Sequence, residues 1–454
     1  MVNTVYQKRK LETSNCICEV RFFPVPKPCT IIKCGTRVGC RLGATRANSF
    51  YRSMTSSLKH RGFAIWSVCQ FIAYLGRWVQ AIGLNWLAYK QTHDAVTLAL
   101  LTGATLGPIL LLSPFAGSLA DRFDGKRILG ATQTLMLVQS LALASLYFFG
   151  HPTFGALWAL ALMQGTLNAL DAPARQLFYR RILPDLCALP SALSVTLLSF
   201  NVSRLLGPAL GGIVAGQLGE GWCFGLAAAT CLPLQLVALR LKLQPAESRK
   251  TTKGAWAAVR YVQNHGVLLR TLSLAIGANL LLLPFIPLLP AFTREALNGG
   301  VSMVGLLSGF EGAGAVAAAL FQGWLVARFA AGHRVMGAYC TVAVGLVGLA
   351  MAPGVGVCAM ALVVLGFSAA VALTATQELL QTQSSSEMRG KVLGLSMTAS
   401  YGMLPLGSLL VSEMAGAHGI RLAFATTASL FLAAVALAGL WHRKAARRSA
   451  AASA

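Results

Sequence analysis

The sequence predicts an all-α membrane protein with twelve transmembrane helices in two six-helix halves. Composition is the first reason: 56% of the 454 residues are hydrophobic and 11% are charged, against about 45–50% and about 25% in soluble proteins. So few charges could not cover the surface of a soluble protein of this size. The 45 glycines and 17 prolines and the mean hydropathy of +0.63 are also typical of membrane helices. The other two reasons are the spacing of the apolar stretches and the places of the basic residues.

Twelve apolar stretches recur along the chain, and each is long enough to cross roughly 30 Å of hydrocarbon as a helix. We expect the spans 62–89, 97–119, 128–149, 154–174, 188–217, 221–240, 268–291, 302–326, 334–352, 356–380, 392–416 and 420–441. Only the stretch from Pro353 to Gly356 separates the ninth span from the tenth. Proline followed by glycine is typical of a turn.

The basic residues predict the orientation of these spans. All but five of the 38 Lys and Arg residues fall in segments on one side of the membrane. The exceptions are Lys90, Arg294 and Arg421 in loops of the other side, and Arg77 and Arg204 within spans. Because loops rich in Lys and Arg stay in the cytoplasm, we expect a multi-pass protein of the cytoplasmic (inner) membrane with both termini cytoplasmic. The net charge of +24 therefore reflects orientation, and we expect no nucleic-acid partner.

The chain divides into five expected segments. They are a disordered basic cytoplasmic tail (1–57), an N-terminal six-helix bundle (58–241), a cytoplasmic linker (242–267), a C-terminal six-helix bundle (268–441) and a cytoplasmic tail (442–454). The first segment could instead be an upstream extension of the true reading frame that starts near Met54. Internal repetition supports two halves, because the string from Gly117 to Phe123 recurs from Gly323 to Phe329 at an offset of 206. Two parallel repeats with a cavity between them are a transporter architecture.

Cysteine and histidine positions give no metal-binding pattern. The 11 Cys and 7 His residues are scattered, and no CxxC pair is present, so we expect free apolar cysteines and neither a metal nor a cofactor. The chain also lacks a P-loop, a nucleophile elbow and a paired carboxylate site. We therefore expect no enzyme, and a driving force that comes from an ion gradient or from the substrate's own gradient.

The strongest local motif is the string that runs from Gly117 through Asp121 and Arg122 to Arg127. A small residue at Gly117 permits close approach of a neighbouring helix. Asp121 then presents a carboxylate that can stabilise a helix N-terminus, with cations directly after it. The alternative, an ordinary turn between two helices, explains the cations but not the whole string.

Small residues define a second motif in the span 188–217. Gly207 and Gly211, like Gly212 and Gly216, are four residues apart, which gives smooth helix faces for close packing. Pro208 removes one backbone donor from the helix. By spacing alone, generic helix packing explains the pattern equally well.

Three ionisable residues lie at membrane depth: Arg77, Arg204 and Glu311. Each costs at least about 2.5–3.5 kcal/mol on insertion scales unless it faces a partner or a cavity. Glu311 is our candidate for a protonatable coupling site, and the two arginines are candidates for contacts with an anionic group of a substrate. The alternative is a structural role, in which they pair with other helices or with backbone carbonyls. Glu378 and Glu413 lie nearer the span ends, where we expect solvated carboxylates.

These motifs resemble the major facilitator superfamily, and most closely its drug- and siderophore-exporter branch, which is typified by the enterobactin exporters. The resemblance covers about residues 60–441. It rests on the Gly117-x-Leu-Ala-Asp-Arg122 string, on the strings 168–176 and 201–212, and on the residues around Gln377, Gln381 and 389–391. The sequence departs from the family's motif at two positions, and both departures are modest. Gly125 stands where the motif usually has a basic residue, and in the repeat of the motif at 323–329 Ala327 stands in place of the acid.

The resemblance implies a secondary active transporter that exports a small organic molecule, drug-like or siderophore-like, by alternating access with proton antiport. The pattern of Arg204, Gly207, Pro208, Gly211 and Gly212 looks like the antiporter signature, which favours export. The implied partners are a small-molecule substrate, protons and the lipid bilayer, and we expect a monomer. An uptake permease or a lysolipid flippase of the same fold, a polytopic membrane enzyme and a transport-dead sensor are the alternatives.

The resemblance also implies a gate at the cytoplasmic face. Gly117 and Asp121 would brace the start of the eleventh span, and Arg122 would meet an acid at the end of the fourth span. Asp171 is the candidate for that acid, and Arg175 could join the same cluster. Exposed ion pairs contribute about 0–1 kcal/mol each, a scale that suits a latch between two states of similar energy.

We predict that Asp121→Asn reduces transport and leaves the protein in the membrane, because the latch loses its carboxylate. Substrate flux at matched protein level in membrane vesicles measures this effect. Unchanged flux at normal protein level would contradict the gating role.

Overall fold

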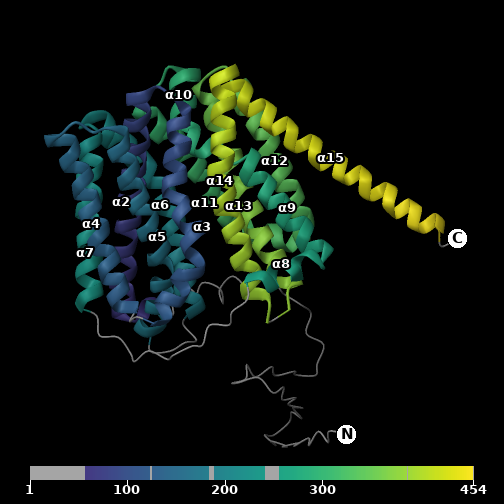
Figure 1. Cartoon of the computed structure of the whole chain (residues 1–454), viewed down its shortest axis with the longest axis horizontal. Coiled ribbons are helices and arrows are strands. Elements are labelled where there is room, and N and C mark those ends of the chain that lie inside the picture. Colours follow the sequence, from purple (N-terminus) through teal and green to yellow (C-terminus); the bar gives the residue numbers. More distant parts are fainter. Residues whose placement is uncertain (1–56, 123–124, 184–188, 241–254, 386, 453–454) are drawn as a thin grey trace, which may run out of the picture. The chain divides into compact units, whose positions relative to one another are not determined.

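The computed structural model describes residues 57–122, 125–183, 189–240, 255–385 and 387–452, and for 113–127 and some shorter stretches it describes no side chains. All contacts given below lie within Met54–Ala454. The predictions for 1–56 and for 241–254 fall outside the described residues. The helices are η1 (Ser57–Lys59), α2 (Arg61–Thr92), α3 (Ala95–Arg122), α4 (Gly125–Phe149), α5 (Phe154–Ile182), α6 (Leu189–Gln217), α7 (Glu220–Arg240), α8 (Ala255–Gln263), α9 (Gly266–Leu281), α10 (Phe285–Leu297), α11 (Val301–Arg328), α12 (Ala331–Met351), α13 (Val355–Gln383), α14 (Arg389–His418) and α15 (Ile420–Ala452) (Figure 1).

In the described parts of the chain, eleven of the twelve predicted spans each fall on a single helix, and the seventh falls on two. Within the described residues, ten helical segments are long and apolar enough to cross a bilayer, with Gly266–Leu297 counted as one. The other two predicted spans are α2 and α5, which fall short of that measure. Polar residues lower their hydropathy: α2 carries Gln70, Arg77 and Gln80, and α5 carries Asn168 and Asp171. These two spans thus bring Gln70, Gln80 and Asp171 into the interior of the bundle.

The seventh span is interrupted, which the sequence analysis did not predict. Helix α9 ends at Leu281, a turn follows, and α10 begins at Phe285 directly after Pro284. Proline has no backbone N–H to continue the helix before it, but it fits well at a helix start. The segment α10 then runs to Leu297, six residues past the predicted end.

The predicted linker contains a helix of its own, α8. Its sequence AWAAVRYVQ buries Ala258 and Val262, which lie four residues apart and share one helix face. This face packs on α9 and α14, and the hydroxyl oxygen of Tyr261 accepts a hydrogen bond from the backbone N–H of Ser385 at 3.1 Å. The spacing of Ala258 and Val262 could have predicted this helix.

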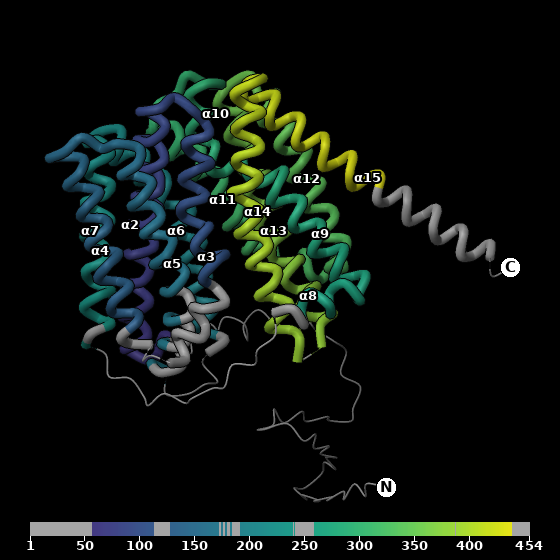
Figure 2. The backbone as a smooth tube through the Cα atoms, in the orientation of Figure 1, coloured from purple at the N-terminus to yellow at the C-terminus, as the bar shows by residue number. Residues whose placement is uncertain are grey.

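The long helices pack in two groups. Helix α2 contacts α6 and α7, α3 contacts α5, and α4 contacts α5 and α7, whereas α13 contacts α11 and α12, and α14 contacts α9 and α15. In Figure 2 the helices α2, α4, α5 and α7 lie on the left, and α8, α9, α12 and α13 lie on the right. The boundary at 242–267 between two moving halves stays a prediction.

The most extensive contacts between these groups are made by two helix pairs: α6 packs along α11, and α3 packs along α14. The α6–α11 contact is so close that a Cβ at Gly212 would lie 2.7 Å from the Cα of Gly305. A Cβ at Gly305 would lie 2.5 Å from the carbonyl oxygen of Pro208, and one at Gly312 would lie 2.6 Å from the Cα of Leu205. We call this contact the glycine seam (Leu205, Pro208, Gly212, Gly305 and Gly312).

The two glycine pairs of α6 face different partners. A Cβ at Gly207 would meet the Cβ of Trp78 on α2 at 2.4 Å, whereas a Cβ at Gly216 would meet the hydroxyl of Ser302 on α11 at 2.1 Å. Both predicted smooth faces of α6 therefore pack closely against another helix. One packs on α2 within the first helix group, and the other packs on α11 of the second group. Helix α6 continues without a break through Pro208.

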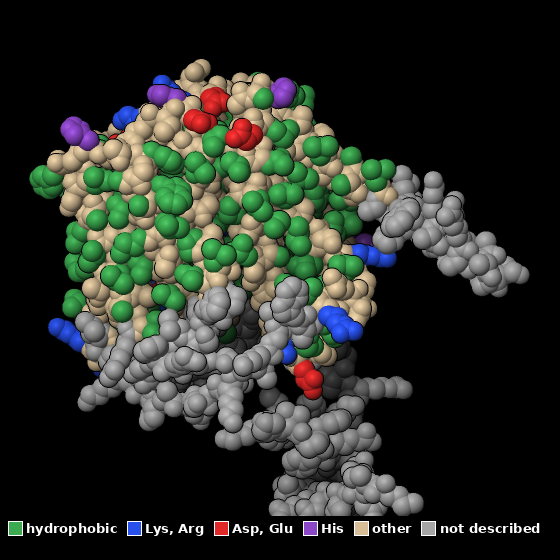
Figure 3. All heavy atoms as spheres, in the orientation of Figure 1, with side chains coloured by type: hydrophobic (Ala, Val, Ile, Leu, Met, Phe, Trp, Pro, Cys, Tyr) green, Lys and Arg blue, Asp and Glu red, His purple; other side chains and the backbone are tan. Residues whose placement is uncertain are grey.

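Apolar side chains cover the outside of the helices. Exposed large residues such as Leu111, Leu320 and Met360 are 69%, 78% and 74% exposed. Figure 3 shows hydrophobic side chains across the middle of the visible face and most of the charged ones near its two ends. A surface of this kind is suited to lipid rather than to water.

We predict that Gly305→Leu destabilises the protein, because a side chain there overlaps the backbone of α6 and overpacking costs roughly 1–3 kcal/mol or more. Gly323→Leu on the same helix is the matched control, since a Cβ at Gly323 has no atom within 4 Å. Thermal unfolding in detergent, followed by tryptophan fluorescence, measures both variants. Equal melting temperatures would contradict the close α6–α11 contact.

Candidate functional site

A buried carboxylate on α5, Asp171, organises the polar side chains of the first helix group. Its side chain is 3% exposed. One oxygen accepts hydrogen bonds from Nε2 of Gln133 at 2.7 Å and from Oγ1 of Thr132 at 3.3 Å. The other oxygen accepts one from Nε of Arg175, which is one helical turn further along α5 and 5% exposed. Charge-assisted hydrogen bonds of this kind are shorter and stronger than those between neutral groups.

Arg77 on α2 joins the same cluster. Its Nη1 lies 3.4 Å from Oδ1 of Asn168 and 4.0 Å from Oδ2 of Asp171. Its guanidinium stands 4.7 Å from the ring centre of Tyr74, a cation–π contact. The buried Nη2 has no hydrogen-bond partner among the described residues. Among the described residues, two arginines therefore lie beside one carboxylate.

The ion pair between Arg204 on α6 and Glu311 on α11 links the two helix groups at membrane depth. The side chains are 20% and 7% exposed. Glu311 is held in place by its backbone, because its carbonyl oxygen packs on Gly366 of α13, where a Cβ would lie at 1.9 Å. The pair lies beside the glycine seam, since Leu205 follows Arg204 and Gly312 follows Glu311.

The structure divides the predicted site residues differently from the sequence analysis. Arg204 and Glu311 come together, but Arg77 lies with Asp171 and Arg175 of the predicted gate instead. The side chains of Gly117, Asp121 and Arg122 lie outside the described residues, so the predicted contact between Arg122 and Asp171 stays a prediction. Glu378, expected to be a solvated carboxylate, accepts hydrogen bonds from Nη2 of the buried Arg334 at 2.7 and 2.8 Å.

Sequence reasoning missed a buried amide network in the first group. Nε2 of Gln80 donates to Gln139 at 3.1 Å and to Gln164 at 3.0 Å, and the hydroxyl of Ser140 donates to Oε1 of Gln80 at 2.7 Å. These residues come from α2, α4 and α5. Their signal in the sequence is the presence of glutamines inside apolar spans, where each unpaired amide would be costly.

A second missed contact joins the two groups near the end of α2. The hydroxyl of Tyr89 donates to Oε1 of Glu295 on α10 at 2.9 Å, and Tyr89 is 2% exposed. Close by along the chain, Lys90 pairs with Glu220 at 3.4 Å, and the hydroxyl of Tyr147 donates to Glu220 at 2.9 Å. This end of α2 and the Asp171 cluster are therefore separate sites along the helix.

Metal-binding and disulfide chemistry find no support in the described part of the chain. No group of three or more His, Cys, Asp or Glu side chains there is placed to hold a metal ion. The described cysteines (Cys69, Cys223, Cys231, Cys340 and Cys358) are free.

We predict that Asp171→Asn lowers stability strongly, because removing one partner of a buried ion pair costs about 3–5 kcal/mol. Asp94→Asn, at an exposed position, is the control and is expected to stay within about 0.5 kcal/mol. The double variant Asp171→Asn/Arg175→Met should lose less than the single one, since it removes a charge along with its partner. Melting temperatures in detergent measure all three, and a neutral Asp171→Asn would contradict the pairing.

Comparison with known proteins agrees with this architecture. The family model described as "transmembrane secretion effector", of the major facilitator superfamily, matches residues 52–453. The staphyloferrin A transporter of Staphylococcus aureus is 28% identical over 77% of this chain and 88% of its own length. The enterobactin exporter EntS of Citrobacter koseri is 26% identical over 83% of this chain and 91% of its own length.

A solved structure has the same fold. It is the inward-facing, unoccupied form of a bacterial homologue of the human lysosomal transporter Spinster, with a TM-score of 0.67. It is 14% identical and covers 84% of this chain and 96% of its own. The predicted fold class and the resemblance to siderophore and drug transporters are confirmed. The chain belongs to the transmembrane secretion effector family of the major facilitator superfamily.

Proposed function

We propose that the protein exports a small organic molecule, siderophore-like or drug-like, across the cytoplasmic membrane by alternating access and in exchange for protons. Both relatives described above are named for siderophore transport, and one is named as an exporter. The observation that carries the proposal is the Arg204–Glu311 ion pair between α6 and α11. A protonatable carboxylate that holds two packed helix groups together can couple a proton to their movement.

Glu311 has the properties that a coupling site needs. Ionised, it attracts Arg204 across the glycine seam in an environment that screens charge poorly. Protonated, it is neutral and that attraction is lost, so each protonation state favours a different arrangement of α6 and α11. The close backbone contact of the seam allows these helices to slide or tilt only between well-packed arrangements.

Two sets of contacts are proposed as gates at the two ends of the pathway. Gly117, Asp121, Arg122, Asp171 and Arg175 form the cytoplasmic gate. The Tyr89–Glu295 hydrogen bond closes the opposite end, because it ties α2 to α10. Alternating access then consists of opening one set while the other is closed.

Substrate recognition is assigned to Arg77 ahead of Arg204. The charge of Arg204 is neutralised by Glu311, whereas Arg77 shares Asp171 with Arg175 and retains an unpaired Nη2 among the described residues. An anionic group of the substrate would provide the missing partner for this Nη2. In this proposal both termini are cytoplasmic, the segments 58–241 and 268–441 are the two moving halves, and the monomer is the transporting unit.

We predict that Glu311→Gln abolishes the stimulation of transport by a pH gradient, because the amide cannot take up and release a proton. Flux of siderophores and of cationic drugs into everted vesicles, with and without an imposed gradient, measures this. Glu413→Gln is the matched control, since Glu413 is an exposed glutamate on α14.

Equal gradient-stimulated flux in Glu311→Gln and the wild type would contradict coupling through this residue. Flux in the opposite direction only, driven by the same gradient, would identify an uptake permease instead of an exporter. Binding without flux in either direction would identify a sensor.

A further inference from the structure

A groove lies on the surface of the second helix group, between the end of α11, the first half of α12 and the middle of α13. Its volume is about 410 Å³. Helices α11 and α12 both pack extensively on α13 but, within the described residues, hardly at all on each other. The face of α13 between them is therefore left open, and this face forms the floor of the groove.

The walls of the groove are apolar along most of their length. They are formed by Leu325, Phe329, Gly337, Ala338, Val363, Val364, Phe367 and Val371, together with the hydroxyl-bearing Thr341 and Ser368. Phe329 and Val364 are 45% and 44% exposed, so the groove opens to the surroundings of the helices. In a membrane protein those surroundings are lipid, and the open side of the groove faces hydrocarbon chains.

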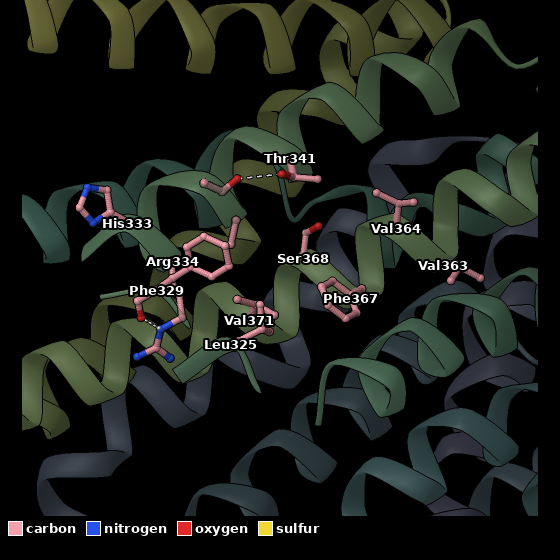
Figure 4. A pocket seen from close by; sticks show the side chains of 12 residues that line it. Leu325, Phe329, His333, Arg334, Thr341, Val363, Val364, Phe367, Ser368 and Val371 are labelled. Atoms are coloured by element: carbon pink, nitrogen blue, oxygen red, sulfur yellow. Dashed lines mark hydrogen bonds between the residues drawn. The ribbon is translucent and has the colours of Figure 1, made fainter. Parts of the chain in front are cut away.

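The groove has a basic end and an apolar end. In Figure 4, His333, Arg334 and Phe329 lie toward one end, and Val363 and Val364 lie toward the other. His333 and Arg334 belong to the first turn of α12, which begins at Ala331. Thr341 stands eight residues after His333, about 12 Å deeper at the helical rise. The groove therefore runs from the membrane surface, where it is basic, toward the middle of the bilayer, where it is apolar.

The charges at the surface end favour an anion. His333 lines this end and is exposed, and the exposed Arg328 directly precedes the lining residue Phe329. Arg334 is 5% exposed, donates Nε to the carbonyl oxygen of Phe329 and is ion-paired with Glu378 through Nη2, so its charge is balanced and Arg328 and His333 are the exposed basic residues of this end. Nη1 of Arg334 is buried and has no hydrogen-bond partner among the described residues. Helix α12 also starts without a side-chain cap, so its first N–H groups add to the positive potential.

We propose that this groove is a binding site for an anionic phospholipid. One acyl chain lies along α13 between α11 and α12, and the phosphate lies at the surface end beside Arg328, His333 and Arg334. The groove is basic at the membrane surface and apolar below it. This arrangement complements an anionic phospholipid, whose phosphate lies at the surface of its leaflet and whose acyl chains lie below. Basic pockets between transmembrane helices recognise anionic headgroups by the same electrostatics. The site is separate from the Arg204–Glu311 pair, so it does not depend on the proposed transport function.

The chain offers a well-matched pair of variants for the test. Gly337 lines the groove, and a Cβ there meets no atom within 4 Å, so Gly337→Leu fills the groove without a clash. Gly348 is also exposed on α12 and equally free of neighbours, but it lies outside the groove. Gly348→Leu is therefore the control.

Native mass spectrometry of the full-length protein, titrated with dioleoyl phosphatidylglycerol or dioleoyl phosphatidylcholine, measures the binding. We expect the wild type and Gly348→Leu to bind phosphatidylglycerol alike. We expect Gly337→Leu to bind it about tenfold or more weakly, since losing the burial of even two methylenes has that effect. Arg328→Gln/His333→Gln should lose the preference for phosphatidylglycerol over phosphatidylcholine. Inorganic phosphate should not compete, because it has no chain to bury.

Thr341→Phe fills the same groove and serves if Gly337→Leu does not fold. Wild-type phosphatidylglycerol binding in the groove-filling variant would overturn the proposal, as would an equal loss in Gly348→Leu. Equal affinity of the wild type for the two lipids would overturn the anionic specificity, and competition by inorganic phosphate would identify a simple anion site instead.

Discussion

A charge inside the hydrocarbon region is costly unless it has a partner, and this constraint determines which helices meet in the protein. Glu311 of α11 requires Arg204 of α6, and the resulting pair crosses between the two helix groups. Asp171 of α5 requires Arg175 and the nearby Arg77 of α2. Nearer the membrane surface, the buried Arg334 of α12 pairs with Glu378 of α13. Each ionisable side chain specifies a neighbour that apolar packing alone would leave open.

Glycines determine how closely those neighbours approach. At the glycine seam the backbones of α6 and α11 are in direct contact, because neither Gly212 nor Gly305 carries a Cβ. In lipid the hydrophobic effect does not drive helices together, so close packing and polar contacts have to supply the association energy. The seam and the Arg204–Glu311 pair combine both contributions in one place. A change of protonation there acts on the contact that joins the two groups.

The two ionic centres differ in how their charged groups are paired, and this difference separates their proposed roles. The Arg204–Glu311 pair has one charge of each sign, and its proposed role is to respond to a proton on Glu311. In the described part of the Asp171 cluster, Nη2 of Arg77 has no hydrogen-bond partner, and the proposed role of this cluster is to receive an anionic group of the substrate. The two halves of the internal repeat have an acid at corresponding positions. Glu378 corresponds to Asp171 at nearly the same offset at which Arg328 corresponds to Arg122. In both halves of the sequence, an acid at this place binds an arginine.

The sequence by itself determined the class of protein, the twelve helices and the residues that needed partners, because hydropathy, charge placement and helical period are local properties of the chain. Family membership followed from the strings around Asp121 and Gly207 for the same reason. Partner choice was decided only by the tertiary structure. Nothing local to Arg77 predicts that it lies with Asp171 rather than with Glu311, and nothing local to Glu378 predicts its contact with Arg334. The break before α10 and the helix α8 had local signals, in Pro284 and in Ala258 and Val262. The groove on α13 had none, because a cavity is a property of three helices together and exists only where their side chains fail to fill the space between them.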